Sequence, residues 1–435
     1  MERKLMTKLK QWKEDKNRKP LIIRGARQVG KTWIMKTFGQ QYFEKTAYVN
    51  FDNNARMKQV FEGDLDIERL VLSISAETGV SIEAENTLII FDEVQEVPKA
   101  LTSLKYFYEN APQYAIVAAG SLLGVALHQG TSFPVGKVDF LDLYPLNFRE
   151  FLCAMGEKQF VSMLDSCDTQ MVTVFKTKYI ERLREYYFVG GMPEVVKDFS
   201  EKKDYNRVRA IQKNLINYYQ QDFSKHAEIK LVPRLNLVWN SIPMQLAKEN
   251  KKYIYGQVRE GSRAKDFELA IQWLLDCGLI HKVQRIQKPD LPLKAYIDFD
   301  AFKLFLVDIG LLIAMTDLDA KVIIEGNKIF TEFKGALTEQ YILQQLISDV
   351  GVIPYYYSTQ NSKGEIDFLV QGKTSVIPIE VKAEENLKAK SLKAFCEKYQ
   401  PSYAVRTSMS DYREQDWMTN IPLYAVKWIK NYVNQ

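Results

Sequence analysis

Short apolar runs alternate with helical patterns over the first 145 residues of the chain. Four of these runs have the length of strands and lack polar alternation, at 20–24, 47–51, 87–91 and 114–119. Runs of this kind are typical of strands that are buried on both faces. Apolar residues at helical spacing fill the segments between them, at 30–38, 55–80 and 98–110. Strands that alternate with helices predict a parallel sheet covered on both faces, and hence one α/β domain over residues 1–145.

The pattern changes twice after residue 145. Residues 146–224 have a helical pattern that is interrupted at 190–193, and we expect them to form a helical domain. In residues 225–327, helical spacing is followed by a strand-like run that begins at Gly278, an order that indicates a winged-helix-like segment. Residues 328–435 return to alternating helices and strands, which predicts a second α/β domain.

Length and composition are those of a globular protein with several domains. At about 100–200 residues per domain, 435 residues allow two to four domains. The net charge of +5 permits a nucleic-acid partner but fits an ordinary basic protein equally well. Four cysteines without a CxxC pair argue against a disulfide framework or a zinc site and fit a reducing compartment. The charged N-terminus and the lack of a run of about 18 apolar residues predict a cytoplasmic protein without a membrane segment.

The first glycine-containing loop has the pattern GxxxxGK[ST] and lies between an apolar run and a helical segment. Glycines at both ends let the backbone curl, so that successive N–H groups point at phosphate oxygens. The lysine is expected to reach the β- and γ-phosphates, and the threonine hydroxyl to bind Mg²⁺. The sequence therefore predicts a site for ATP and Mg²⁺, with the nucleotide-binding residues Gly25, Ala26, Arg27, Gln28, Val29, Gly30, Lys31, Thr32 and Trp33.

Two acidic residues follow the third apolar run, as expected of the Walker B strand that accompanies such a loop. Asp92 is predicted to hold the Mg²⁺ shell, and Glu93 is the candidate base that polarises the attacking water. Ser121 ends the next apolar run beside the same edge. Its hydroxyl is expected either to contact the γ-phosphate or the lytic water, or to cap a helix that follows. These roles make ATP hydrolysis the predicted reaction, with Lys31 as a further catalytic residue.

A second cluster of charged residues is predicted near the C-terminus. Asp367 lies on one expected strand, and Glu380 and Lys382 lie two residues apart on the next, so that they point from the same face. Glu339 lies on an upstream helix that can pack beside them. Carboxylates that converge in this way can hold one or two Mg²⁺ ions and act on a phosphodiester, while the lysine orients water. The alternative is an edge hairpin with outward charges, although the apolar residues around Glu380 favour burial.

Several motifs resemble those of prokaryotic AAA+ ATPases of the archaeal-ATPase type, which carry a C-terminal domain of unknown function. The resemblance covers 24–33, 91–95, 142–151, 190–194, 302–311 and 335–339. It implies an α/β fold class: a P-loop AAA+ NTPase with a helical lid and a winged-helix-like segment, followed by a restriction-endonuclease-like α/β domain. These parts are expected at 1–145, 146–224, 225–327 and 328–435. In that family the C-terminal part resembles the PD-(D/E)xK nuclease fold, whose motif maps onto Glu339, Asp367, Glu380 and Lys382.

An NTPase joined to a phosphodiester-type site leaves three functions open. The first is an ATP-driven machine that binds or processes DNA. The second is a nucleotide-controlled regulatory switch, in which the nuclease-like domain is an inactive scaffold. The third is a metal-dependent nuclease that ATP only gates. The resemblance also implies a homo-oligomer, for which a ring is one form, with an arginine finger from a neighbouring subunit; the candidates are Lys137, Arg149, Arg182 and Arg184.

Overall fold

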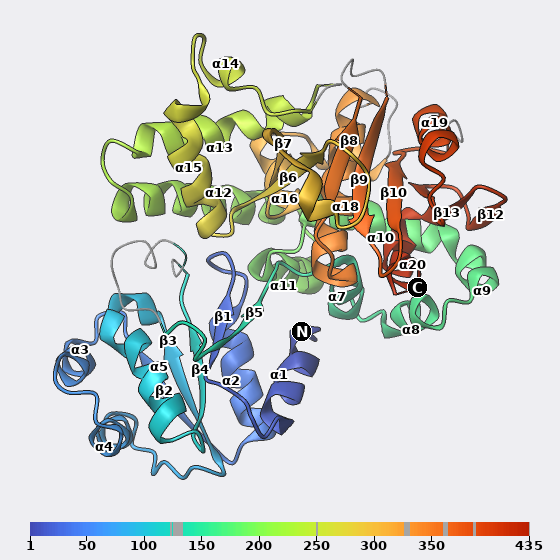
Figure 1. The fold of residues 1–435 in the computed structure, drawn as a ribbon. Helices are drawn as coiled ribbons and strands as arrows, with labels where there is room; N and C mark the ends of the chain where they lie inside the picture. The colour runs from blue at the N-terminus through green and yellow to red at the C-terminus, as the bar shows by residue number, and fades with distance from the viewer. Residues whose placement is uncertain are drawn as a thin grey trace. The chain divides into compact units, whose positions relative to one another are not determined.

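A computed structural model describes residues 1–121, 124, 134–248, 251–325, 331–359, 364–385 and 389–434 of the chain. The chain divides into two compact units, whose elements are labelled in Figure 1. The first unit comprises Met1–Tyr144 with Asp276–Leu279, and the second comprises Pro145–Leu275 with Ile280–Gln435. Among the described residues, no helix has both the length and the apolar character that crossing a membrane requires.

The first unit is built around a five-stranded sheet in the order β2-β3-β4-β1-β5, in which all neighbouring strands are parallel. The strands are β1 (Leu21–Arg24), β2 (Lys45–Asn50), β3 (Thr87–Asp92), β4 (Ala115–Ala119) and β5 (Asp139–Asp142). The four predicted strands are confirmed. The apolar runs did not reveal β5, because its residues are partly or fully exposed. Since parallel strands share one carboxyl edge, the loops after β1, β3 and β4 meet there.

Helices cover both faces of this sheet (Figure 1). They are α1 (Leu5–Glu14), α2 (Lys31–Tyr42), α3 (Ala55–Glu62), α4 (Ile67–Thr78) and α5 (Pro98–Asn110), with a 3-10 turn η1 (Val94–Glu96). Residues of α3, α4 and α5 pack in one core cluster with Ile89 and Phe91, which alternate along β3 and so share a face. On the other face, Trp12 of α1 packs against Phe38 of α2 with ring centroids 6.2 Å apart.

The second unit begins with helices, as the sequence predicts for residues 146–224. They are α7 (Phe148–Ala154), α8 (Lys158–Ser166), α9 (Thr169–Val174), α10 (Lys176–Val189), α11 (Pro193–Lys202) and α12 (Tyr205–His226). Three further helices then precede a two-stranded antiparallel hairpin. The helices are α13 (Val232–Leu246), α14 (Tyr255–Val258) and α15 (Ala264–Asp276), and the strands of the hairpin are β6 (Ile280–Ile286) and β7 (Ile297–Leu306). The element order predicted for the winged-helix-like segment is therefore present.

The hairpin belongs to an eight-stranded sheet in the order β12-β13-β11-β10-β9-β8-β6-β7. The other strands are β8 (Tyr355–Ser358), β9 (Glu365–Gln371), β10 (Val376–Val381), β11 (Val405–Ser408), β12 (Arg413–Gln415) and β13 (Met418–Pro422). Strand β6 pairs in parallel with β8, with Arg285 opposite Tyr356. A domain boundary near residue 327 would therefore divide the strands of one sheet, and the division into four domains stays a prediction.

Helices and short turns complete the second unit. They are η2 (Leu293–Tyr296), α16 (Ile309–Met315), α17 (Ala320–Ile324), α18 (Thr331–Gln345), the π-helical turn η4 (Leu346–Val350), α19 (Lys390–Tyr399), η5 (Leu423–Trp428) and α20 (Ile429–Val433). The side chain of Gln340 on α18 bonds both the N–H and the carbonyl group of Leu306. This helix is therefore fixed to the end of β7 by backbone recognition, as well as by its apolar residues.

A buried junction in the second unit explains the two glycine-containing motifs at 190–194 and 302–311. A Cβ at Gly190 would lie 2.2 Å from Oδ1 of Asp308, and one at Gly191 would lie 2.1 Å from the carbonyl oxygen of Leu146. Asp308 caps α16 by accepting a hydrogen bond from the N–H of Leu311, and it also accepts one from the N–H of Gly191 at 2.6 Å. Burial raises the pKa of Asp308 to about 6. These motif residues therefore hold backbone segments together.

Candidate functional site

The loop after β1 has the geometry that phosphate binding requires. Gly25 has a φ of +149°, and a Cβ there would lie 2.2 Å from the carbonyl oxygen of Leu143, so this position requires glycine. Gly30 has a φ of +95°, and α2 begins directly after it without a side-chain cap. A helix start of this kind presents its first backbone N–H groups to an anion.

Lys31 lies at the first position of α2, with its side chain inside this loop. Its ammonium group donates to the carbonyl oxygens of Gly25, at 2.9 Å, and Ala26, at 2.8 Å. Burial lowers the pKa of Lys31 to about 8, although the charges of Glu93 and Asp92 act in the opposite direction. A triphosphate at this loop would favour the charged form of Lys31, because an anion offsets the desolvation of an ammonium group.

The end of β3 brings Asp92 against the start of α2. Its Oδ2 accepts hydrogen bonds from the hydroxyl groups of Thr32, at 2.6 Å, and Tyr48, at 2.9 Å. Burial and the negative charge of Asp92 raise the pKa of Tyr48, so that its hydroxyl stays protonated. A hydroxyl and a carboxylate oxygen this close fit the coordination of one Mg²⁺ ion, which prefers oxygen ligands. The sequence analysis missed Tyr48, whose signal is its place two residues before Asn50, the register partner of Asp92.

Glu93 has a φ of +51°, in the left-handed region that non-glycine residues adopt mainly at turns and functional sites. Its Oε2 accepts hydrogen bonds from Nε2 of Gln95, at 2.7 Å, and from Oγ of Ser121, at 3.0 Å. Burial raises the pKa of Glu93, but these hydrogen bonds and the charge of Lys31 outweigh it, so the pKa lies below its usual value. The carboxylate is therefore ionised at neutral pH, as a general base must be.

Ser121 lies beside the same edge of the sheet, as the sequence predicts. Its hydroxyl and its backbone N–H both donate to Glu93, the latter at 3.3 Å. The helix that it was expected to cap would begin at Leu122, which lies outside the described residues. The structure thus gives Ser121 a partner that the sequence did not suggest, and its contact with a phosphate or a water stays a prediction. Arg27 and Trp33 are exposed, with 43% of Trp33 accessible, and their nucleotide-binding roles also stay predictions.

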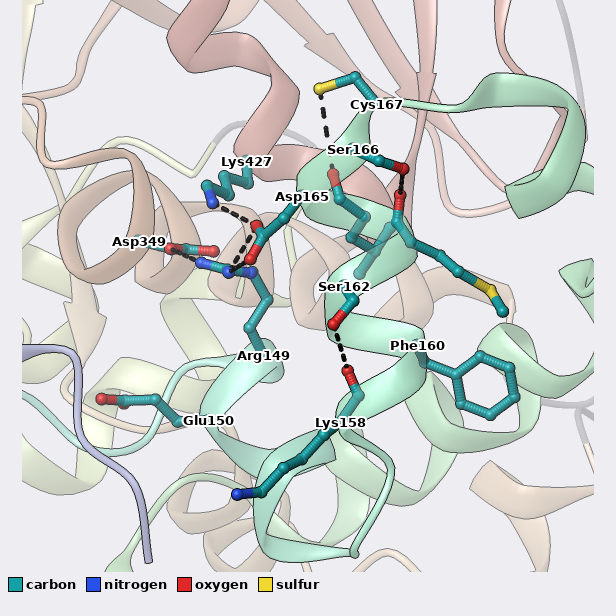
Figure 2. A network of polar contacts seen from close by, with 12 residues as sticks. Arg149, Glu150, Lys158, Phe160, Ser162, Asp165, Ser166, Cys167, Asp349 and Lys427 are labelled. Atoms are coloured by element: carbon teal, nitrogen blue, oxygen red, sulfur yellow. Dashed lines mark hydrogen bonds and ion pairs between the residues drawn. The ribbon is translucent and has the colours of Figure 1, made fainter.

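The candidates for an arginine finger have partners within their own units. Lys137 pairs with Glu109 at 3.0 Å in the first unit. Figure 2 shows Arg149 in a network in the second unit, between Asp165 and Asp349, with Lys427 also bound to Asp165. Arg182 pairs with two carboxylates, Glu157 and Glu185, and Arg184 donates to the carbonyl oxygen of Ile324 at 3.4 Å. A finger role for any of them stays a prediction.

The predicted C-terminal cluster is brought together in the second unit. Strands β9 and β10 are antiparallel, with Phe368 opposite Ile379, so Asp367 and Glu380 lie at adjacent positions. Oδ2 of Asp367 accepts a hydrogen bond from the N–H of Val381 at 2.7 Å. Burial and the charges of Glu339 and Glu380 raise the pKa of Asp367 well above its usual value.

Lysines contact the carboxylates of this cluster. Lys382 pairs with Oε1 of Glu380 at 2.6 Å, as its predicted position suggests. Two lysines that the sequence analysis missed pair with Glu339: Lys251 contacts Oε1, and Nζ of Lys303 lies 3.7 Å from Oε2. Lys303 is 0% exposed, which the sequence signals by placing a single charge inside the apolar run 301–306.

The carboxylates of the candidate metal centre are only partly satisfied by contacts within the described part of the chain. In the part of the chain that the structure describes, no group of three or more His, Cys, Asp or Glu side chains is placed to hold a metal ion. The buried Oε2 atoms of Glu339 and Glu380 receive no hydrogen bond from the described residues. The metal-binding roles of Glu339, Asp367 and Glu380, and the catalytic roles of Asp367, Glu380 and Lys382, stay predictions.

Comparison with known proteins defines the class of the first unit. Residues 17–152 match a family model described as an AAA domain. Together with the parallel sheet and the phosphate loop, this match shows an AAA-type, ATPase-like P-loop fold. Two further family models match the rest of the chain, and both are described as domains of unknown function: DUF8612 at residues 180–322 and DUF4143 at residues 334–426. The nuclease-like nature of the C-terminal part is therefore unconfirmed.

The chain also has weak likenesses to solved structures. A Walker-type ATPase of Pyrococcus abyssi is 14% identical, with a TM-score of 0.44, over 72% of this chain and 94% of that one. Drosophila ORC bound to DNA is 13% identical, with a TM-score of 0.27, over 68% and 90% of the two chains. Cdc6p from Pyrobaculum aerophilum is 9% identical, with a TM-score of 0.24, over 68% and 86%. No curated protein matches the chain.

Proposed function

We propose that the first unit binds ATP with Mg²⁺ and hydrolyses it, and that the second unit couples this reaction to DNA. The observation that carries the proposal is the arrangement at the carboxyl edge of the parallel sheet. The side chain of Lys31 lies within the glycine-containing loop, and the hydroxyl of Thr32 lies 2.6 Å from Asp92. An ionised Glu93 comes directly after β3. The match of residues 17–152 to an AAA domain supports the same reaction.

In this proposal, the loop and α2 bind the triphosphate. Backbone N–H groups at the start of α2 and the ammonium group of Lys31 stabilise the phosphate oxygens, both in the bound state and as charge moves during transfer. Thr32 and Asp92 would hold Mg²⁺, which supplies charge neutralisation and orients the phosphates when it is bound. Tyr48 fixes the orientation of Asp92 through its hydrogen bond at 2.9 Å.

Glu93 then acts on the attacking water. It directly follows β3, and its carboxylate accepts hydrogen bonds from Gln95 and from Ser121, which lies two residues after the end of β4. These two residues hold one oxygen, Oε2, and so leave Oε1 as the atom that can accept a proton from water.

An ATPase assay with a matched pair of lysine variants tests this function. Lys31→Ala removes a charge that hydrogen-bonds the phosphates, and we expect ATP affinity to fall by about 10- to 100-fold. The control is Lys10→Ala, which removes an exposed lysine on α1 that pairs only with Glu14 among the described residues. Equal ATP binding by the Lys31→Ala variant and the unmodified chain would refute the proposed site.

The proposed link to DNA is supported by the basic net charge and by the helix–hairpin order of residues 232–306. Lys and Arg contacts with phosphates release counterions, so affinity should fall steeply with salt. Gel shifts with duplex, branched and single-stranded DNA at several salt concentrations measure this. If none of these DNAs binds in a salt-dependent way, the DNA part of the proposal is wrong while the ATPase part stands.

One observation favours the second candidate, a nucleotide-controlled regulatory switch with an inactive nuclease-like scaffold. Glu339 and Glu380 of the C-terminal cluster pair with lysines, and so does the neighbouring Glu365. A switch requires ATP binding to change a partner interaction without any phosphodiester cleavage. Plasmid nicking with Mg²⁺ or Mn²⁺ that Asp367→Ala abolishes would exclude the switch and favour a nuclease.

We also propose that the chain forms a homo-oligomer, in which a neighbouring subunit supplies a positive charge to the ATP site. Completion of a site by a second subunit makes the ATPase rate per subunit depend on protein concentration. A rate per subunit that stays constant across the dissociation range, measured alongside sedimentation, contradicts this part of the proposal.

A further inference from the structure

Four charged side chains of the C-terminal cluster are largely buried, whereas Glu365 and Lys382 are 25% and 32% exposed. The exposed fraction is 0% for the side chain of Lys303, 6% for Glu339 and Glu380, and 13% for Lys251. Buried charges are stable only when they are paired or bound to metal. The contacts of these side chains decide between ion pairing and metal binding.

Lys303 has three partners in the cluster. Its ammonium group pairs with Oε1 of Glu365 and lies 3.7 Å from Oε2 of Glu339. It also lies 4.8 Å from the ring centroid of Tyr356. Lys303 is therefore a fixed positive charge among the acidic residues.

Lys251 supplies the second charge from a neighbouring segment. Its ammonium group contacts the other oxygen of Glu339, Oε1. The segment is held against β7, because the N–H of Tyr253 donates to the carbonyl oxygen of Phe302 at 2.8 Å and the two rings stack 5.6 Å apart. Both oxygens of Glu339 therefore face ammonium groups that come from outside the predicted four-residue motif.

The charge balance favours lysines over a metal ion. With every group counted as ionised, Glu339, Glu365, Asp367 and Glu380 carry four negative charges, and Lys251, Lys303 and Lys382 carry three positive ones. One negative charge remains. Adding a divalent ion would leave a buried positive excess, whereas without Lys251 and Lys303 the same ion would be needed to offset three negative charges. The residues present therefore do not fit a divalent metal ion.

We infer that Lys251 and Lys303 take the place of a divalent cation in this cluster, which makes it a metal-independent ion-pair junction that joins residues 251–306 to the helix α18 and the strand β9. Oε1 of Glu339 contacts Lys251 and its Oε2 lies 3.7 Å from Nζ of Lys303, while Oε1 of Glu380 pairs with Lys382. This inference goes beyond the proposed ATPase and does not depend on it. It does predict that the second unit hydrolyses no phosphodiester by a metal-dependent route.

Manganese binding to the full chain, measured without nucleotide by electron paramagnetic resonance, tests the inference. The unmodified chain and its Asp367→Asn variant should bind equal amounts of Mn²⁺. The double variant Lys251→Met with Lys303→Met should gain about one Mn²⁺ per chain, because the freed carboxylates are ligands that this ion prefers. Adding Asp367→Asn to the double variant should remove the gained site. The control is Lys265→Met with Lys294→Met, two exposed lysines whose loss should add no site.

Two outcomes overturn the inference. One is Mn²⁺ binding by the unmodified chain that Asp367→Asn removes, a result that needs no lysine variant and so decides even if the double variant fails to fold. The other is a folded double variant that gains no site. Loss of ATP hydrolysis in Lys31→Ala bears on the first unit alone, so failure of the ATPase proposal and failure of this inference are separate results.

Discussion

The two units of this chain place lysine and carboxylate side chains together in opposite ways. In the first unit, Asp92 accepts hydrogen bonds from two hydroxyl groups, and Lys31 donates to two backbone carbonyl oxygens. In the second unit, Glu339 and Glu380 accept from ammonium groups. The first arrangement leaves each charge to be matched by a ligand, while the second matches the charges within the protein.

The pKa shifts of the two buried lysines express this difference. Burial lowers the pKa of Lys31 to about 8, because the partners nearest to it are neutral carbonyl groups. The pKa of Lys303 is raised, because carboxylates outweigh its burial. The lowered pKa of Lys31 therefore accompanies the site proposed for an anion, and the raised pKa of Lys303 accompanies ion pairs within the protein.

The largest expected effect is on catalysis at the open site. Glu93→Gln keeps the shape and the hydrogen-bonding capacity of the side chain but removes the base. We expect kcat for ATP hydrolysis to fall by about 10²- to 10⁴-fold. ATP affinity should change by much less, and a filter-binding assay with labelled ATP measures it. A variant that hydrolyses ATP at the original rate would show that another group activates the water.

A methionine exchange at each buried lysine compares the two regions directly. Lys303→Met removes the lysine that pairs with Glu365 and one of the two lysines beside the buried Glu339, and we expect the free energy of unfolding to fall by about 3 kcal/mol. Lys31→Met removes a buried charge that is poorly compensated, so the unfolding free energy should stay the same or rise at pH 7. Urea unfolding, in the absence of nucleotide, measures both. Equal destabilisation by the two variants would contradict the proposed difference between Lys31, whose charge is poorly compensated, and Lys303, whose charge is paired.

A smaller effect is expected for the residue that orients Asp92. Tyr48→Phe removes one hydrogen bond and little volume, and it should weaken Mg²⁺-dependent ATP binding by about 3- to 10-fold. Tyr106→Phe on α5 is a matched control in the same unit. Binding measured with and without Mg²⁺ separates the two contributions, since a purely structural role for Tyr48 would weaken both equally.

The smallest expected effect is the uptake of part of a proton when ATP binds. The pKa of Lys31 is lowered from 10.5 to about 8 in the folded chain, so the folded state binds fewer protons than the unfolded state between these values. Phosphates should restore the charged form, so ATP binding at pH 8 should take up about half a proton, and affinity should fall as pH rises through 8. Calorimetry in buffers of different ionisation enthalpy measures this uptake, which Lys31→Met should abolish.

Most residues of the candidate ATP site could be predicted from the sequence, because they lie in two short segments of the chain. The loop motif holds the glycines and Lys31 within eight residues, and the acidic pair ends an apolar run. What the sequence did not reveal depends on strand register and side-chain packing. Tyr48 reaches Asp92 because β2 and β3 are neighbours, and Gln95 reaches Glu93 through the turn η1.

Only part of the C-terminal charged cluster could be predicted from the sequence. The motif of Asp367, Glu380 and Lys382 lies on two adjacent strands, so alternation alone places those residues together. Lys251 and Lys303 come from a segment that was assigned to a separate domain, and nothing local ties them to Glu339. The single sheet that joins these segments depends on the pairing of β6 with β8, a long-range contact that hydrophobic periodicity does not encode.

The pairing of β6 with β8 has a practical consequence for dissecting the protein. A fragment that begins at residue 328 would lose β6 and β7 and expose the backbone N–H and carbonyl groups along one side of β8. Bare strand edges pair with other chains and promote aggregation. The smallest soluble piece of the C-terminal region is therefore one that keeps the hairpin, whatever limits the two families of unknown function suggest.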